Sequence, residues 1–122
     1  MAFKFEKLIV WQRALELANS VHLLTRSFPK EELYILTSQI KRAADSVVLN
    51  IAEGSTGHTE KEFARFLTMA NRSALEVVAC LHLAKKRNLI SSEHFDNYYS
   101  ELTEIVKMIQ GLKKSVLKNS MD

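Results

Sequence analysis

Apolar residues recur at spacings of three and four along most of the chain, which is the period of an amphipathic helix. The pattern predicts four such helices, over about residues 8–26, 30–53, 60–87 and 92–118. In the second helix, for example, Ile40, Val47 and Ile51 fall on one side. Apolar stripes on four helices with short connections bury best against one another. The sequence therefore predicts one all-α domain spanning residues 1–122, folded as an antiparallel up-down-up-down four-helix bundle.

Short signals separate the helices. Pro29 suits the first turn of the second helix, and Thr59 followed by Glu62 has the spacing of a capping box before the third. Gly54 is expected to end the second helix in the left-handed conformation. Three further expectations are an N-cap at Ser91 or Ser92, a C-cap at Asn88 and a close helix contact at Gly111.

The composition supports a globular helical protein. The chain has three glycines and one proline, too few for the turns of most all-β folds. Its single cysteine, Cys80, allows no internal disulfide and fits a reducing compartment. No run of about 18 apolar residues occurs, and no signal peptide is recognisable at the start. We therefore expect a cytoplasmic protein that does not interact with membranes.

The sequence offers no recognisable catalytic or metal centre. Di-iron bundles use Glu-x-x-His pairs, and none occurs here. Residues 54–57 contain two glycines but lack the lysine and the spacing of a phosphate-binding loop. We expect no enzymatic activity, no catalytic residue, no metal and no cofactor, with Cys80 a buried structural thiol and the following histidines structural: His22, His58, His82 and His94.

Polar residues flank the apolar stripe of the second helix. At about 100° per residue, five of them fall within about 80° of one another. This stripe is either a solvated helix face or a polar seam against the third helix or another subunit. In the seam, Arg42 would meet the carboxylate of Glu76 or Glu53, and Asn50 would hydrogen-bond across. The seam residues are Gln39, Arg42, Ser46, Asn50 and Glu53 of the second helix and Glu76 of the third.

The formal net charge is +3, and the basic residues are unevenly distributed. Antiparallel packing would bring the start of the third helix near the end of the fourth. Their basic residues either complement the helix dipoles and aid solubility or bind phosphate groups. No aromatic residues alternate with these charges, so base-specific readout is not expected. The candidate nucleic-acid-binding residues are Lys61, Arg65, Arg72, Lys113, Lys114 and Lys118.

Several segments together form a specific signature. They are residues 8–12, 28–29, 36–44 and 50–54, followed by Phe63, residues 66–67, Ala70, Ser73 and Glu76. As a set, they resemble a bacterial family of four-helix-bundle proteins encoded within intervening sequences of 23S ribosomal RNA genes. The chain departs from the family pattern at two positions. Val48 stands where proline is usual, which should leave the second helix unbroken, and Arg72 stands where glycine is usual.

The resemblance implies a homo-oligomer, specifically a homopentamer. A structurally similar relative, the accessory variability protein of diversity-generating retroelements, has a basic surface and works with reverse transcriptase and RNA. The expected partners are therefore other copies of the chain and RNA or DNA. The main functional hypothesis is a non-enzymatic, ring-forming bundle that binds nucleic-acid phosphates. The alternative is an oligomeric scaffold or protein-interaction module without nucleic-acid binding.

Overall fold

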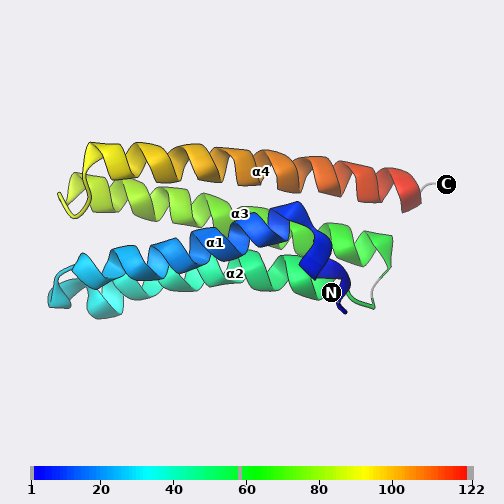
Figure 1. The fold of residues 1–122 in the computed structure, drawn as a ribbon, viewed down its shortest axis with the longest axis horizontal. Helices are drawn as coiled ribbons and strands as arrows, with labels where there is room; N and C mark the ends of the chain where they lie inside the picture. The colour runs from blue at the N-terminus through cyan, green and yellow to red at the C-terminus, as the bar shows by residue number, and fades with distance from the viewer. Residues whose placement is uncertain (1, 58, 121–122) are drawn as a thin grey trace.

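The computed structural model describes residues 2–57 and 59–120 of the 122-residue chain. Its long helices are α1 (Ile9–Leu24), α2 (Ser38–Gly54), α3 (Glu60–Lys86) and α4 (Ser92–Ser120). Successive helices run in opposite directions, and the start of α3 and the end of α4 lie at the same end of the bundle (Figure 1). The predicted antiparallel up-down-up-down bundle is confirmed.

One apolar core joins the four helices. α3 packs along both α2 and α4, while α1 lies mainly on α2 and also contacts α4. The residue stripes predicted from the sequence supply this core, including Ile40 and Val47 of α2, Leu67 and Leu81 of α3, and Ile105 of α4, all fully buried. Val48 is also buried, and α2 continues through it without a break, as expected.

The second helix does not begin as the sequence predicted. A 3₁₀ turn, η3 (Lys30–Glu32), leads into a π-helical turn, η4 (Leu33–Thr37), before α2 starts. Because a π turn is wider than an α turn, it shifts the phase of the side chains that it contains. Leu33 was expected in the apolar stripe but is exposed, and Tyr34 is 89% exposed.

The predicted N-caps of α3 and α4 are present. The Thr59 side chain accepts a hydrogen bond of 3.2 Å from the backbone N–H of Glu62. Ser91, rather than Ser92, caps α4 by accepting a bond of 3.0 Å from the backbone N–H of His94. The C-cap of α3 is Arg87 and not the predicted Asn88, which follows it with the left-handed φ of 60° that is common one residue after a C-cap.

Two of the glycine predictions are wrong. Gly54 is helical and buried in α2, and the positive φ of this connection, 71°, belongs to Gly57. A Cβ atom on Gly54 would lie 2.6 Å from the Phe66 Cβ, so this glycine allows α2 to approach α3. A Cβ atom on Gly111 would meet no heavy atom within 4 Å, so no close helix contact depends on that residue.

Candidate functional site

Five of the six candidate basic residues lie at one end of the bundle, at the start of α3 or the end of α4, whereas Arg72 lies near the middle of α3. Lys61, Arg65 and Arg72 are exposed on α3, and their spacing places them within about 40° of one another around the helix. On α4, Lys114 and Lys118 are exposed and Lys113 is half-buried. Because α3 begins where α4 ends, Lys61 and Lys118 share this end of the molecule (Figure 1).

Some of these cations are already neutralised. Arg65 donates to Glu62 at 2.9 Å and lies 4.9 Å from the centre of the Phe66 ring. The hydrogen bond to Glu62 and then its charge raise the pKa of Arg65. Within residues 2–57 and 59–120, no ion pair involves the other five candidates: Lys61, Arg72, Lys113, Lys114 and Lys118. These five charges are available for an external anion.

The last half of α4 is basic over a long stretch. Residues 105–120 include four lysines and no aspartate or glutamate. Lys107 reaches back to Glu104 at 3.9 Å, a weak and exposed pair. The positive potential of this segment therefore faces little compensation from α4 itself.

Two of the basic residues at the opposite end have structural contacts. Arg87, after α3, pairs with Glu32 at 3.1 Å, and the Lys85 ammonium lies 4.5 Å from the centre of the Phe95 ring. These contacts connect the end of α3 to η3 and to α4. Arg26, Lys30 and Lys86 at this end are exposed and are in no ion pair of the described residues, so cations without ion pairs occur at both ends of the bundle.

The polar seam between α2 and α3 exists in part. Ser73 Oγ of α3 donates to Ser46 Oγ of α2 at 2.8 Å, in a half-buried position. The Gln39 amide donates to the Glu76 carboxylate at 3.3 Å, in an exposed position. Asn50 does not cross to α3: its amide donates to the Ser46 carbonyl and hydroxyl, both at 2.9 Å, on its own helix.

Arg42 does not make the expected ion pair. It is exposed and donates to Ser38 Oγ at 3.4 Å, and among the ion pairs of the described residues it has no carboxylate partner. Glu53 is exposed further along α2. The Arg42 guanidinium instead points along α2 toward Ser38. A groove of ≈ 490 Å³ lies beside it, lined by residues that include Tyr34, Ile35, Arg42, Ser73 and Glu76.

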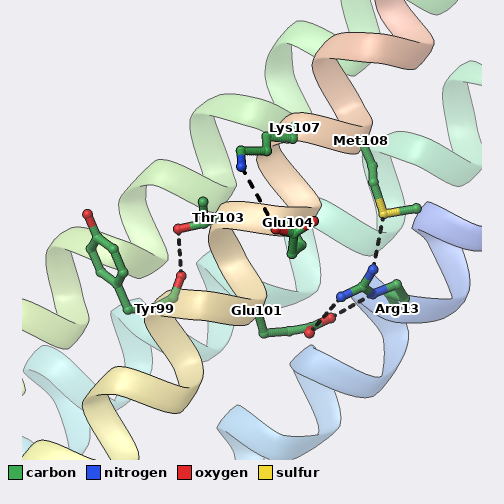
Figure 2. A network of polar contacts seen from close by, with 7 residues as sticks. All are labelled: Arg13, Tyr99, Glu101, Thr103, Glu104, Lys107 and Met108. Atoms are coloured by element: carbon green, nitrogen blue, oxygen red, sulfur yellow. Dashed lines mark hydrogen bonds and ion pairs between the residues drawn. The ribbon is translucent and has the colours of Figure 1, made fainter.

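Sequence reasoning missed the polar contacts between α1 and α4. Arg13 donates to both carboxylate oxygens of Glu101, at 2.9 and 2.8 Å, and also contacts the Met108 sulfur at 3.5 Å (Figure 2). The hydrogen bond to Glu101 is the main cause that raises the pKa of Arg13. No sequence signal could have revealed this pair, because 88 residues separate the partners and local spacing says nothing about their register.

Two further contacts of α1 are polar. The Tyr98 hydroxyl donates to the Ser20 carbonyl at 3.0 Å, and burial raises the pKa of this phenol. His22 Nε2 lies 3.0 Å from an Asp45 oxygen of α2. Both contacts connect neighbouring helices, and His22 and Asp45 also line a surface groove of ≈ 340 Å³.

The described residues contain no evident reaction centre. Within them, no group of three or more His, Cys, Asp or Glu side chains is placed to hold a metal ion. Cys80 is buried, and burial is the main cause that raises the pKa of its thiol, with the charge of Glu76 second. His58 lies outside the described residues. Among the described helices, none is sufficiently long and apolar to cross a membrane.

Comparison with known proteins places this arrangement in a family. A crystal structure of a protein of unknown function, from the S23 ribosomal protein family of Bacteroides thetaiotaomicron, superposes with a TM-score of 0.79. The two chains are 24% identical, and the match covers 87% of this chain and 96% of the other, which shows the shared fold. No curated protein matches the sequence. The sequence pattern of the 23S rRNA-intervening sequence proteins matches residues 6–111, and the chain belongs to that family.

Proposed function

We propose that this protein is a non-enzymatic, homo-oligomeric bundle that binds RNA or DNA phosphates through its basic end. The observation that carries the proposal is the group of cations without ion pairs among the described residues: Lys61, Arg72, Lys113, Lys114 and Lys118. Lysine and arginine side chains that displace counterions from a phosphate backbone supply most of non-specific nucleic-acid affinity.

The placement of these cations favours an extended anion. On α4, Lys107, Lys114 and Lys118 recur over about 16 Å of helix and lie within about 40° of one another. Lys114 and Lys118 are one turn apart and could share one phosphate, whereas Lys107 lies about 10 Å further back along the axis. A phosphate backbone can therefore contact all three lysines, and a single small anion cannot.

Self-association is the second part of the proposal. Three exposed apolar residues lie on the outer side of the α2 segment: Tyr34 (89%), Ile35 (59%) and Leu49 (65%). A groove of ≈ 690 Å³ adjoins Leu49 and is lined also by Phe5 and Arg42. Exposed apolar surface beside a groove is typical of protein interfaces. A closed ring, such as the pentamer that the family resemblance implies, would bring several basic ends together and raise avidity.

Salt-dependent binding tests the nucleic-acid part. A labelled RNA or DNA strand should bind at low ionic strength, with an affinity that falls steeply as salt rises. The double variant Lys114→Glu/Lys118→Glu should weaken binding by at least about tenfold and flatten the salt dependence. Arg26→Glu/Lys30→Glu is the matched control, because it changes the charge equally at the opposite end. Absence of binding at low salt would contradict the proposal.

The alternative function is an oligomeric scaffold without nucleic-acid binding, and the exposed α2 residues favour it. The mass of the protein in solution tests their role. Ile35→Lys/Leu49→Lys should lower the mass to that of a single chain, whereas a lysine at the exposed Leu23 of α1 should not. An assembly that dissociates in the first variant but never binds nucleic acid would support the scaffold.

A further inference from the structure

A second feature of the α3–α4 side bears on the kind of nucleic acid. His82 of α3 and Tyr99 of α4 meet edge to face, with ring centroids 6.3 Å apart and planes at 90°. Behind them, the buried Phe95 ring lies 4.9 Å from His82 and 5.7 Å from Tyr99. The Phe95 ring thus holds two aromatic rings at the surface, and Tyr99 remains 47% exposed.

Tyr99 lies on the side of α4 that carries Lys107, which pairs with Glu104 at 3.9 Å (Figure 2). Figure 2 shows Tyr99, Thr103 and Lys107 on one side of α4, while Glu101 and Met108 point to Arg13 of α1 on the other. The α1 contacts therefore leave the Tyr99 side uncovered.

The lysines continue this side toward the end of α4. By helical spacing, Lys107, Lys114 and Lys118 follow Tyr99 within about 100° around the helix. They lie about 12, 22 and 28 Å beyond it along the axis. On α3, which runs in the opposite direction, the exposed Lys86 lies one turn after His82 and therefore on the other side of the rings from Lys107. The rings thus lie between Lys86 of α3 and the lysines of α4.

The direction of the row is set by charge. Asp96 is exposed one turn before Tyr99 on the same side of α4, where it would repel a phosphate. In the other direction, the exposed Glu104 pairs with Lys107 at 3.9 Å, and residues 105–120 contain no aspartate or glutamate. A backbone that contacts Tyr99 would therefore extend toward Lys107 and Lys114 instead of toward Asp96.

We propose that the His82–Tyr99 pair stacks against an unpaired base, so that the nucleic acid bound by this protein is single-stranded. This inference rests on the phosphate binding proposed above and adds strand selectivity to it. Bases inside a duplex are already stacked on their neighbours and cannot reach a protein ring, whereas a single strand can present a base face. Stacking of this kind tolerates any base, so no sequence specificity is implied.

The test compares strand types with the full-length protein. Fluorescence anisotropy would follow a labelled oligouridylate and an RNA duplex of the same length. The oligouridylate should bind more tightly, and Tyr99→Ala should weaken its binding roughly 5- to 100-fold while leaving duplex binding unchanged. Tyr99→Phe should retain the wild-type affinity, because the ring is kept. The slope of affinity against salt should stay the same in Tyr99→Ala, since no cation is lost.

Two controls make the outcome decisive. Leu23→Ala removes a side chain of similar exposure, 50%, from α1 and should leave binding unchanged. His82→Ala should weaken oligouridylate binding in the same direction as Tyr99→Ala, which provides an independent reading if one variant folds poorly. Binding of neither strand at low salt would overturn the proposed function itself. Equal binding of both strands, or wild-type affinity in Tyr99→Ala, would overturn the stacking inference alone.

Discussion

At the residue scale, the close packing of α2 against α3 depends on Gly54 having no side chain. A Cβ atom there would lie 2.6 Å from the Phe66 Cβ and 3.0 Å from the Phe63 ring. Gly111 differs, because its α4 position has open space around it. Sequence alone could not separate these two glycines, since both lie within a helical pattern and the contact is made by another helix.

Alanine at the two glycines should therefore change stability in opposite directions. Gly54→Ala should lower the free energy of unfolding by roughly 1–3 kcal/mol, because the backbones or Phe66 must move. Gly111→Ala should raise it by about 1 kcal/mol, since alanine favours a helix where nothing clashes. Urea unfolding would measure both, and the same direction of change in both variants would contradict this account.

Cys80 gives the stability a pH dependence. The buried thiol has a raised pKa in the folded protein, while in the unfolded chain it ionises near its ordinary pKa of about 8.5. Above that pH, the unfolded state holds fewer protons than the folded state. Below about pH 8.5, the buried thiol should therefore make its full contribution to the free energy of unfolding. As pH rises further, this contribution should be lost.

The measurement is urea unfolding from about pH 7.5 to 9.5, a window that ends below the ordinary ionisation of tyrosine. Wild type should lose more stability across this window than Cys80→Ala, which lacks the titrating group. Tyr98, whose pKa burial also raises, would add its own loss only at higher pH. Parallel pH profiles for the two proteins would contradict a buried, neutral thiol.

At the element scale, local sequence signals predicted the N-caps of α3 and α4 correctly. They did not predict how the second helix begins. Thr59 and Ser91 act as caps because their hydroxyls reach N–H groups three residues ahead, a relation that the sequence displays directly. The π turn at Leu33–Thr37 has no such signal. It adds a residue to one turn, and its cost is offset by packing of Leu36 into a core formed by distant residues.

Asn88 gives an element-scale prediction, because α3 ends on its left-handed φ of 60°. Asn88→Gly should raise the free energy of unfolding by up to about 1 kcal/mol, since glycine has no Cβ penalty there. Asn88→Ala should lower it by about 1 kcal/mol, because alanine adopts this conformation poorly. Thermal unfolding followed by circular dichroism would compare the two, and equal midpoints would show that the cap does not determine where α3 ends.

At the scale of the whole molecule, topology turns separate charge clusters into one basic end. The sequence predicted that Lys61 and Lys118 meet, because a four-helix antiparallel order fixes which ends are neighbours. It did not predict the His82–Tyr99 contact or the Arg13–Glu101 pair, since these depend on the rotation and register of packed helices. The fold and the coarse distribution of charge could thus be predicted from the sequence, whereas the side-chain contacts between helices could not.

The family match ends at residue 111, whereas Lys113, Lys114 and Lys118 lie beyond it in α4. A chain ending after Leu112 should keep the helical bundle, because most of the core precedes that residue, but it should melt at a lower temperature through loss of the buried Val116. It should also bind nucleic acid at least about tenfold more weakly at low salt, because three of the five cations without ion pairs are lost. The full-length variant Lys113→Gln/Lys114→Gln/Lys118→Gln separates the two effects: it should melt close to wild type and bind as weakly as the shortened chain. If the glutamine variant binds as wild type does, the end of α4 contributes packing alone and the phosphate contacts must lie elsewhere.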